Sequence, residues 1–366
     1  MRYLLRSILA IVLIIGTIVV MQNSLERNEK KNNSITQSSK SEDMKKIEPF
    51  SGEIHQSVFV PYWNIPTLLS NSDEHDTVIY FGVSPDAKGN IIHDSGFSNI
   101  GLFLKNTSAD KERLLTVRMF NTENNQTILD EPDIQKKIID ETIQLTIDNN
   151  FDGIVLDLEM GVIPFDDTKD KITSFIKRFS EVAHNGIIPL LRDNPDNTKA
   201  LTFSLTIYGD TFYRARPYDV EKLAYAVDEV YVMAYDFHKS RGEPGPNFPF
   251  SDKQKYGYDF QKMISDFTKV VPREKLTILF GMYGYDWTLG AQGKPLKTAT
   301  AIPLNEIDSE GAVVDSRSKE KYVTYIDDDG FDHILWFEDK ESVAVKIEYL
   351  KSQGIGKVGY WVWGYF

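Results

Sequence analysis

The chain has 366 residues, of which 41% are hydrophobic, and this is enough to bury the core of one large α/β domain or of two smaller ones. Its 54 acidic and 41 basic residues give a net charge of −13, which argues against a nucleic-acid-binding protein, because phosphate binding rewards clustered Lys and Arg. The sequence contains no cysteine, and this excludes disulfide bonds, thiolate metal sites and a lipid-modified N-terminal cysteine.

The first predicted element is a membrane anchor over residues 1–21. Arg2 and Arg6 precede an almost unbroken apolar run from Ile8 to Met21, which with the preceding residues approaches the ~17–20 residues that cross a bilayer. The flanking Arg residues predict a single-pass protein of the cell membrane with an extracytoplasmic domain. A cleaved signal peptide and a secreted protein are the alternative, although no small-x-small cleavage site follows the run; a cytosolic core helix is a third interpretation. Residues 22–50 are polar, which predicts a disordered linker.

Residues 51–366 alternate short apolar runs with amphipathic stretches. Amphipathic patterns over Asp133–Asn149 and Asp170–His184 predict two helices. The apolar runs predict strands that are covered on both faces, at Ser57–Tyr62, Thr77–Val83, Leu114–Met119, Gly153–Glu159, Leu201–Ile207, Glu229–Tyr235, Leu276–Met282 and Lys357–Val362. Eight strands with intervening helices predict a (β/α)8 TIM barrel. A doubly wound open sheet is the alternative, but no glycine-rich phosphate loop follows the first strand.

The stretch from 285 to about 339 is too long for a simple loop between a barrel strand and its helix. It contains Val323–Ile326 and His333–Phe337, which are expected to pair as two strands. We therefore predict a small α+β insertion after the seventh strand of the barrel.

The strongest chemical signal is the segment Phe151–Glu159. Side chains alternate along a strand, so Val155, Asp157 and Glu159 share one face, and the three apolar residues between them share the other. The apolar face is expected to pack on the helices, which directs the acids into the barrel at the end where active sites of this fold lie. Crowded carboxyl groups in a partly dry site raise at least one pKa, as a general acid requires. Solvated or salt-bridged acids at a strand end are the alternative.

Here the sequence resembles glycoside hydrolase family 18, the chitinases and their peptidoglycan-cleaving relatives. Asp152, Gly153, Asp157 and Glu159 match the family's D-G-x-D-x-D-x-E strand. Four later segments are similar to further family motifs in the same order, and the resemblance covers about Gln56 to Phe366. These segments are Met233–Asp236, Gly281–Trp287, Trp336–Lys346 and Gly359–Trp363.

The resemblance implies a retaining, substrate-assisted glycosidase acting on β-1,4-linked polysaccharide that contains N-acetylglucosamine. Glu159 would protonate the leaving oxygen, Asp157 would accept the acetamide N–H, and the Tyr235 hydroxyl would hold the acetamide carbonyl. Asp152 and Gly153 would be structural. Substrate contacts are expected from Tyr62, Phe81, Met233, Asp236, Tyr283 and Trp361, with Trp361 stacked on the sugar.

The sequence departs from the family pattern at two places. Val155 stands where the family has a further Asp, and the strand-three S-x-G-G is replaced by Leu115–Met119, in which Arg118 would point inward as a counter-ion. We expect these changes to lower or retune activity. A glycan-binding, lectin-like protein on the same barrel is therefore the alternative from another functional class.

Other chemistries find no support in the sequence. The six His residues show no H-x-x-x-H or H-x-H spacing, which argues against a catalytic metal, and we expect no cofactor. Neither a G-x-S-x-G elbow nor a Walker A motif is present. The expected partner is a polysaccharide, either peptidoglycan or chitin, bound by a monomer that contacts the membrane through its N-terminal segment.

Overall fold

A computed structural model of the chain describes residues 47–65, 74–160, 167–191 and 194–366. Within these ranges no helix is long and apolar enough to cross a bilayer. The prediction of a single-pass protein of the cell membrane is corrected on this finding, because no described helix can serve as the span. The predicted anchor, 1–21, and residues 22–46 of the predicted linker lie outside the described residues. All of the elements below belong to the unit Glu48–Phe366.

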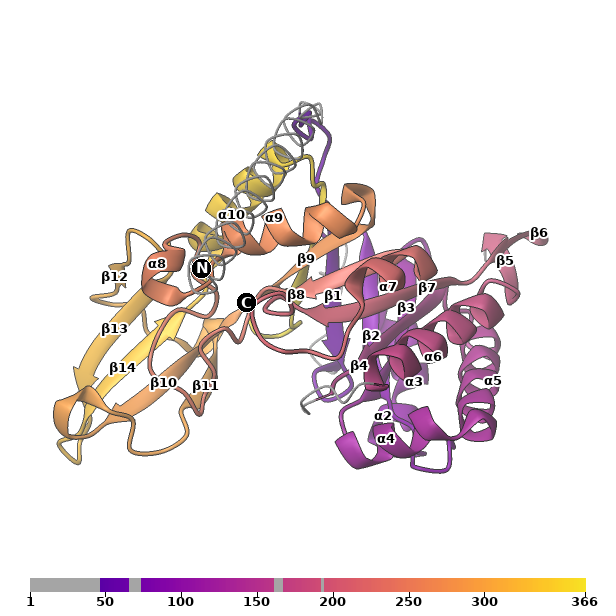
Figure 1. Ribbon diagram of the computed structural model, residues 1–366, viewed down its shortest axis with the longest axis horizontal. Helices are drawn as coiled ribbons and strands as arrows, with labels where there is room; N and C mark the ends of the chain where they lie inside the picture. Colours follow the sequence, from indigo (N-terminus) through magenta and orange to yellow (C-terminus); the bar gives the residue numbers. More distant parts are fainter. Residues whose placement is uncertain (1–46, 66–73, 161–166, 192–193) are drawn as a thin grey trace, which may run out of the picture. The chain divides into compact units, whose positions relative to one another are not determined.

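Parallel strands close into a barrel in the order β1-β15-β9-β8-β7-β4-β3-β2 (Figure 1). This closure excludes the open doubly wound sheet. Every predicted strand of the barrel is present, with bounds within two residues of the prediction. The strands are β1 (His55–Pro61), β2 (Thr77–Val83), β3 (Glu112–Met119), β4 (Gly153–Leu158), β7 (Thr202–Tyr208), β8 (Glu229–Met233), β9 (Leu276–Gly281) and β15 (Lys357–Trp361).

The two faces of the barrel strands pack into two separate hydrophobic clusters. Along β4, Ile154, Leu156 and Leu158 belong to the outer cluster, between the barrel and the helices. Val155 belongs to the inner cluster, which fills the barrel with residues such as Phe59. The predicted alternation of β4 is therefore confirmed, and Asp157 points to the same side as Val155.

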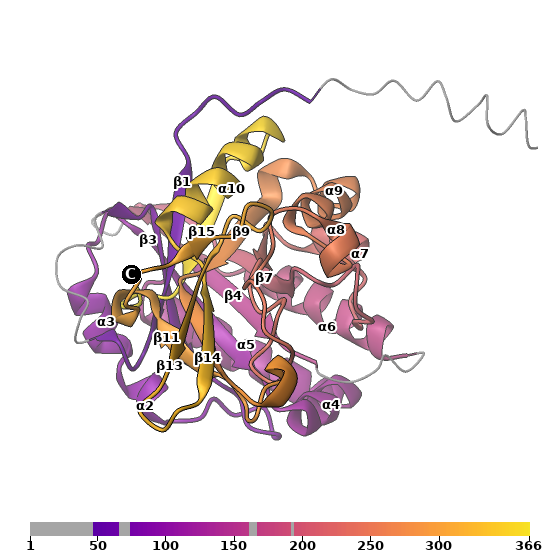
Figure 2. The ribbon, with the colours of Figure 1, turned by 90° about the vertical axis from the view of Figure 1, so that its left-hand side faces the viewer.

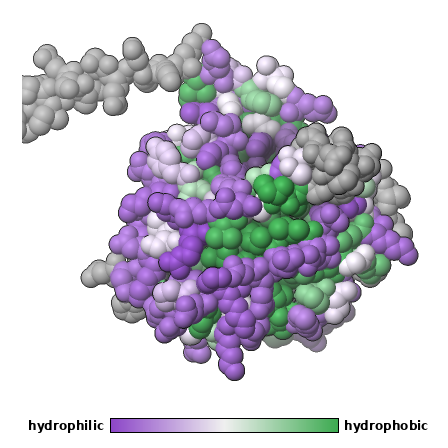
Figure 3. Space-filling view, turned by 90° about the vertical axis from the view of Figure 1, so that its right-hand side faces the viewer, coloured by the Kyte–Doolittle hydropathy of each residue, from purple (hydrophilic) through white to green (hydrophobic). Residues whose placement is uncertain are grey.

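Helices cover the outside of the barrel (Figures 1 and 2). The predicted helices are present as α5 and α6, and α6 buries Phe175 and Phe179 on the side that faces the barrel. Hydrophobic residues form a band between hydrophilic ones on the face that carries these two helices (Figure 3). The helices are α2 (Ser95–Ser98), α3 (Ile100–Asn106), α4 (Thr122–Asp130), α5 (Pro132–Asp148), α6 (Thr168–Ala183), α7 (Val220–Ala226), α8 (Lys253–Tyr256), α9 (Phe260–Val270) and α10 (Lys340–Ser352); a hairpin of β5 (Ile187–Leu191) and β6 (Asn194–Ala200) precedes β7.

A second, antiparallel sheet leaves the barrel directly after β9, in the order β11-β10-β14-β13-β12 (Figure 2). The predicted pair of strands forms its β13–β14 ladder. The prediction of an α+β insertion is wrong in its helical part, because the only helical elements between β10 and β14 are 3-10 turns, at Ala291–Gly293 and Leu304–Glu306. The strands are β10 (Tyr283–Leu289), β11 (Thr300–Pro303), β12 (Val313–Val314), β13 (Lys321–Ile326) and β14 (Asp332–Phe337).

Candidate active site

The carboxyl ends of the barrel strands surround a cavity of about 340 Å3. This is the end at which enzymes of this fold carry their active sites. All of the residues predicted to take part in catalysis or substrate binding line the cavity, with the exception of Tyr62. They are Phe81, Asp157, Glu159, Met233, Tyr235, Asp236, Tyr283 and Trp361.

Asp157 projects from β4 into the barrel and is only 4% exposed. The Thr206 hydroxyl, on the neighbouring strand β7, donates a hydrogen bond to Oδ1 of Asp157. Burial, and to a smaller extent the charge of Glu159, raises the pKa of Asp157 to about 8, although the Thr206 hydrogen bond acts against this shift. Asp157 therefore keeps its proton near neutral pH unless a positive charge forms beside it.

Glu159 follows the last residue of β4 and lies at the mouth of the barrel. Its backbone N–H donates to the carbonyl of Met119 at 2.9 Å, and its Oε2 accepts a hydrogen bond of 2.6 Å from the Tyr208 hydroxyl. Burial raises the pKa of Glu159, the Tyr208 hydrogen bond lowers it, and the charge of Asp236 raises it again. A raised pKa is what a carboxyl group needs to act as a general acid near neutral pH.

Two aromatic rings form one wall of the cavity beside these acids. The Tyr235 ring is stacked against Trp361, with centroids 6.4 Å apart and an angle of 26° between the planes. Trp361 also meets the edge of Phe81 at 4.7 Å. Burial, followed by the charges of Asp157 and Glu159, raises the pKa of Tyr235, so its hydroxyl stays protonated and able to donate a hydrogen bond.

Asp236 is held in a left-handed backbone conformation, with φ of 56°. Its N–H donates to Oδ1 of Asn247 at 2.7 Å. The hydroxyls of Tyr283 and Tyr285 both donate to its Oδ1, the second at 2.9 Å. The Asp236 carboxylate is therefore oriented by the first strand of the inserted sheet.

A buried ionic cluster fixes the loop that carries Asn247. Lys346 of α10 donates to Glu320 at 3.0 Å and to Glu338, and none of the three residues is exposed to solvent. Glu320 in turn accepts hydrogen bonds from the backbone N–H groups of Asn247 and Phe248. The cluster thus joins α10 and the inserted sheet to the loop that orients Asp236.

The two departures from the family pattern lie side by side inside the barrel. Arg118 of β3 is in register with Asp157, and Thr116 is in register with Val155. The Arg118 guanidinium carbon lies 5.1 Å from the centroid of the Tyr62 ring, and Arg118 lines the cavity as predicted. Tyr62 therefore packs beneath Arg118, and its exposed neighbour Trp63 lines the cavity instead.

Five residues at or beside the cavity were not predicted from the sequence, namely Tyr208, Trp63, Phe120, Tyr285 and Tyr365. Tyr208 could have been found, because it ends a strand on which Ser204, Thr206 and Tyr208 alternate as inward-facing polar residues. The others line the cavity from segments that follow the strand ends or from the inserted sheet.

Comparison with known proteins identifies the family. The sequence model of glycosyl hydrolases family 18 matches residues 105–365, which is well over half of the chain. The chain belongs to this family of glycoside hydrolases. A cortical fragment-lytic enzyme of Bacillus cereus is 30% identical over 156 residues, which are 41% of this chain and 34% of that enzyme. The chain spans about half the length, or less, of several curated relatives that it matches.

Solved structures share the fold of this family 18 chain. The Bacillus cereus spore cortex-lytic enzyme SleL superposes with a TM-score of 0.66 and 20% identity, over 86% of this chain and 72% of that one. Human YKL-39, a pseudo-chitinase that retains chitooligosaccharide binding, superposes with a TM-score of 0.70 and 17% identity, over 84% of this chain and 92% of its own.

The two remaining motif residues of this family 18 chain lie at the opposite end of β4. Oδ2 of Asp152 accepts the backbone N–H of Arg113 at 2.8 Å, and Oδ1 lies 3.0 Å from the Lys199 ammonium. A side chain at Gly153 would collide with Thr202 of β7, because a Cβ atom would lie 1.9 Å from its hydroxyl. Asp152 and Gly153 therefore hold β4 between its neighbours and are far from the cavity along the strand.

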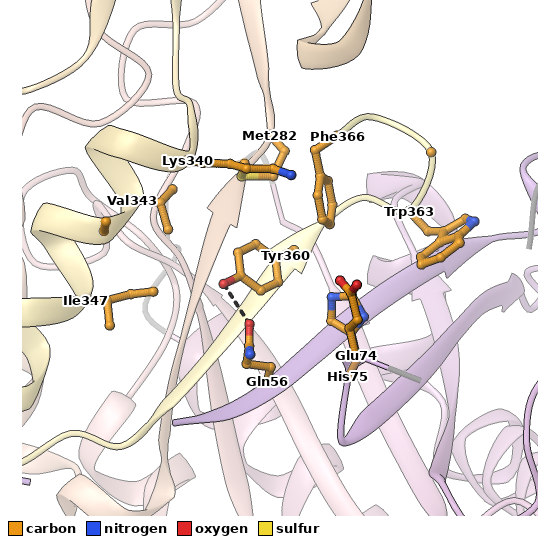
Figure 4. Close-up of a pocket in the computed structure, with 12 residues that line it drawn as sticks. Gln56, Glu74, His75, Met282, Lys340, Val343, Ile347, Tyr360, Trp363 and Phe366 are labelled. Carbon is orange, nitrogen blue, oxygen red and sulfur yellow. Dashed lines mark hydrogen bonds between the residues drawn. The ribbon is translucent and has the colours of Figure 1, made fainter. Parts of the chain in front are cut away.

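A second cavity, of about 530 Å3, lies between α10 and the outer face of β15 (Figure 4). Two of its polar side chains are hydrogen-bonded to each other, because the Tyr360 hydroxyl donates to Oε1 of Gln56 at 3.0 Å. Its described lining holds one carboxyl group, that of Glu74, and so lacks a pair of acids like Asp157 and Glu159. In the part of the chain that the structure describes, no group of three or more His, Asp and Glu is arranged to bind a metal ion.

Proposed function

We propose that this chain is a retaining glycosidase that cleaves β-1,4-linked polysaccharide containing N-acetylglucosamine, with Glu159 as the general acid and base. The observation that carries the proposal is the meeting of Asp157, Glu159 and Tyr235 in one cavity at the carboxyl end of the barrel. The family alone does not carry it, because members of the fold such as YKL-39 bind chitooligosaccharide as pseudo-chitinases.

In the first step Glu159 gives its proton to the glycosidic oxygen as that bond breaks. The oxygen of the substrate's own 2-acetamido group attacks the anomeric carbon and forms a cyclic oxazolinium ion. Asp157 accepts the acetamide N–H and stabilises the positive charge, and its Oδ2 is suited to this role because Oδ1 is occupied by Thr206. The Tyr235 hydroxyl would donate to the acetamide oxygen.

In the second step the Glu159 carboxylate removes a proton from a water molecule, which attacks the anomeric carbon and opens the ring. Two inversions at that carbon give net retention. Trp361 would stack against the apolar face of the sugar, since it lies beside Tyr235 in the wall of the cavity. The Asp236 carboxylate would meet substrate hydroxyls.

Peptidoglycan is the proposed polymer, and chitin fragments are the rival within the same class. Support for peptidoglycan comes from relatives that are named for lysis of the spore cortex or of its fragments. The rival function is a lectin that binds these glycans without cleaving them, favoured by Val155 at the position of a family Asp.

The test is product release by the full chain and by Glu159→Gln from peptidoglycan sacculi and from chitooligosaccharides, followed by mass spectrometry. We expect turnover by the wild type, and a loss of at least ~100-fold in the variant with its folding and glycan binding retained. Binding without any product from the wild type would establish the lectin instead. Turnover by Glu159→Gln at the wild-type rate would remove Glu159 from the mechanism.

A further inference from the structure

Arg118 is a charged group that the proposed mechanism does not use. Among the described residues that line the cavity, Arg118 alone carries a positive charge, and Asp157, Glu159 and Asp236 line the same cavity. It lies next to Asp157 across the β3–β4 ladder, where paired strands are ~4.8 Å apart. The only ion pair that Arg118 forms among the described residues is a long one, with Asp94, and burial of an incompletely paired charge is costly.

The neighbours of Arg118 hold the guanidinium in place without using all of its donors. The guanidinium carbon lies 5.1 Å from the Tyr62 ring and 5.4 Å from the Phe81 ring, which are cation–π distances. The nearest carboxylate oxygen of Asp94 is 3.9 Å away, beyond hydrogen-bond distance. Nε of Arg118 is buried and has no hydrogen-bond partner among the described residues, so it is closed to a ligand. The side chain is 11% exposed and lines the cavity, so a ligand would meet the terminal nitrogens of the guanidinium.

Asp157 is an incomplete counter-ion for this arginine. Its Oδ1 already accepts the Thr206 hydroxyl, and burial raises its pKa, so it carries less than a full negative charge near neutral pH. A guanidinium binds a carboxylate through two parallel hydrogen bonds, which no sugar hydroxyl can match. The group that best completes the surroundings of Arg118 is a carboxylate on the substrate.

We propose that Arg118 binds a free carboxylate on the sugar that adjoins the cleaved N-acetylglucosamine, namely the lactyl carboxylate of N-acetylmuramic acid. This inference rests on the proposed function. It names the substrate as peptidoglycan strands whose stem peptides have been removed, because in peptide-bearing strands the same carboxyl group is tied up in an amide bond. An amide-bond hydrolysis that frees the lactyl group must then supply the substrate.

The inference can be tested first with the wild-type full chain and matched glycans. One sample consists of peptide-free peptidoglycan strands with free lactyl carboxylates, and the second of the same strands after conversion of those carboxylates to N-methylamides. We expect kcat/KM to be about 10- to 100-fold higher on the acid strands, the range that a charge-assisted bidentate contact supports. Equal rates on the two strands would overturn the proposal.

Variants then assign the preference to Arg118. Arg118→Gln is expected to remove the preference for acid over amidated strands, and Arg118→Lys, which keeps the charge but loses the fork, to retain part of it. The matched control is Lys136→Gln, which removes a charge from an exposed side chain on α5 and should keep the full preference. An Arg118→Gln protein that loses rate equally on both strands would make Arg118 a counter-ion of Asp157 and refute the proposal.

If the proposed glycosidase function is wrong, the experiment gives a result that differs from failure of the Arg118 proposal alone. A wild-type protein that cleaves neither strand is no glycosidase for this glycan, and the binding of the two strands by calorimetry then decides the role of Arg118. Tighter binding of the acid strands that Arg118→Gln abolishes would support the carboxylate contact. Equal binding of both strands would refute it.

Discussion

The Tyr208 hydroxyl donates a 2.6 Å hydrogen bond to Oε2 of Glu159, from the end of the neighbouring strand β7. This contact favours the ionised carboxylate and so opposes the burial that raises the pKa of Glu159. We predict that Tyr208→Phe raises the pKa of Glu159 and moves the alkaline limb of the kcat profile to higher pH. Loss of a hydrogen bond to a charged group should move this limb by roughly 1–2 pH units.

The measurement is kcat against pH for Tyr208→Phe and for a control, Tyr225→Phe, whose side chain is 82% exposed and remote from the cavity. The control should reproduce the wild-type profile. If the alkaline limb of Tyr208→Phe stays in place or moves to lower pH, the hydrogen bond does not tune Glu159.

The barrel strands were predictable because the signal for each of them is local. A parallel strand covered on both faces consists of a continuous apolar run, and the observed strands β2 and β9 follow such runs closely. The direction of Asp157 and Glu159 was predictable for the same reason, since alternation along β4 leaves one arrangement that buries its apolar residues. Strand β10 was not predicted, because it interleaves Gly, Asp and Thr and pairs with β14, which lies far along the chain.

The surroundings of the acids were harder to predict, because they depend on distant parts of the chain. Glu320 lies in a polar stretch that looks exposed, and its partner Lys346 is 26 residues away. Trp63 and Tyr62 are adjacent, and only the packing of Arg118 on the Tyr62 ring decides which of them lines the cavity. Local pattern therefore predicted the strand that carries the two acids, and long-range contacts determined the cavity wall around them.

Asp157 gives a prediction about stability. Its pKa is about 8 in the folded protein, against ~3.9 for an unfolded Asp. Because the folded value is the higher one, the folded state gains stability from protonated Asp157 at low pH and loses it as pH rises from about 4 to about 8. Asp157→Asn cannot ionise, so we predict that it is more stable than the wild type at pH 9 by ~1–3 kcal/mol, while losing activity.

The measurement is thermal or urea unfolding of the wild type and Asp157→Asn between pH 4 and pH 9. The difference in the free energy of unfolding between Asp157→Asn and the wild type should shrink towards zero near pH 4. Asp170→Asn is the control, because the Asp170 side chain is 75% exposed and should show no such trend. A variant that is less stable than the wild type at every pH would contradict a raised pKa of Asp157 in the folded protein.

Val155→Asp tests the departure from the family pattern. Val155 is fully buried, and the Thr116 hydroxyl beside it in register has no hydrogen-bond partner among the described residues. An Asp at this position would gain that donor and would add a like charge below Asp157. We predict that the Asp157–Glu159 pair then holds its proton more tightly, which moves the alkaline limb of kcat to higher pH.

A double-mutant cycle isolates the contribution of Thr116. Val155→Asp should destabilise the protein, and it should do so by ~1–2 kcal/mol more in a Thr116→Val background, where the new carboxyl group lacks its donor. Additive effects on the free energy of unfolding would mean that Thr116 does not meet the new side chain. An unaltered pH profile would make position 155 a packing position only.

Lys346 gives the last prediction, because its removal leaves Glu320 and Glu338 buried without their cation. Burial raises the pKa of Glu338, and the charge of Lys346 opposes that shift. Lys346→Met should therefore destabilise the protein by ~3–5 kcal/mol, as expected when one partner of a buried ionic cluster is removed. Lys351→Met, on the same helix, loses only a pair with exposed Glu348 and should cost less than ~1 kcal/mol.

A rescue separates the buried charges from the loss of packing. Adding Glu320→Gln and Glu338→Gln to Lys346→Met removes both unpaired charges, so at least half of the lost stability should return. The same triple variant should show a raised KM, because a neutral amide at position 320 binds the Asn247 N–H less strongly and Asn247 orients Asp236. If the added substitutions restore no stability, the cost of Lys346→Met arises from packing. An unchanged KM would mean that Asp236 is oriented by Tyr283 and Tyr285 without help from the cluster.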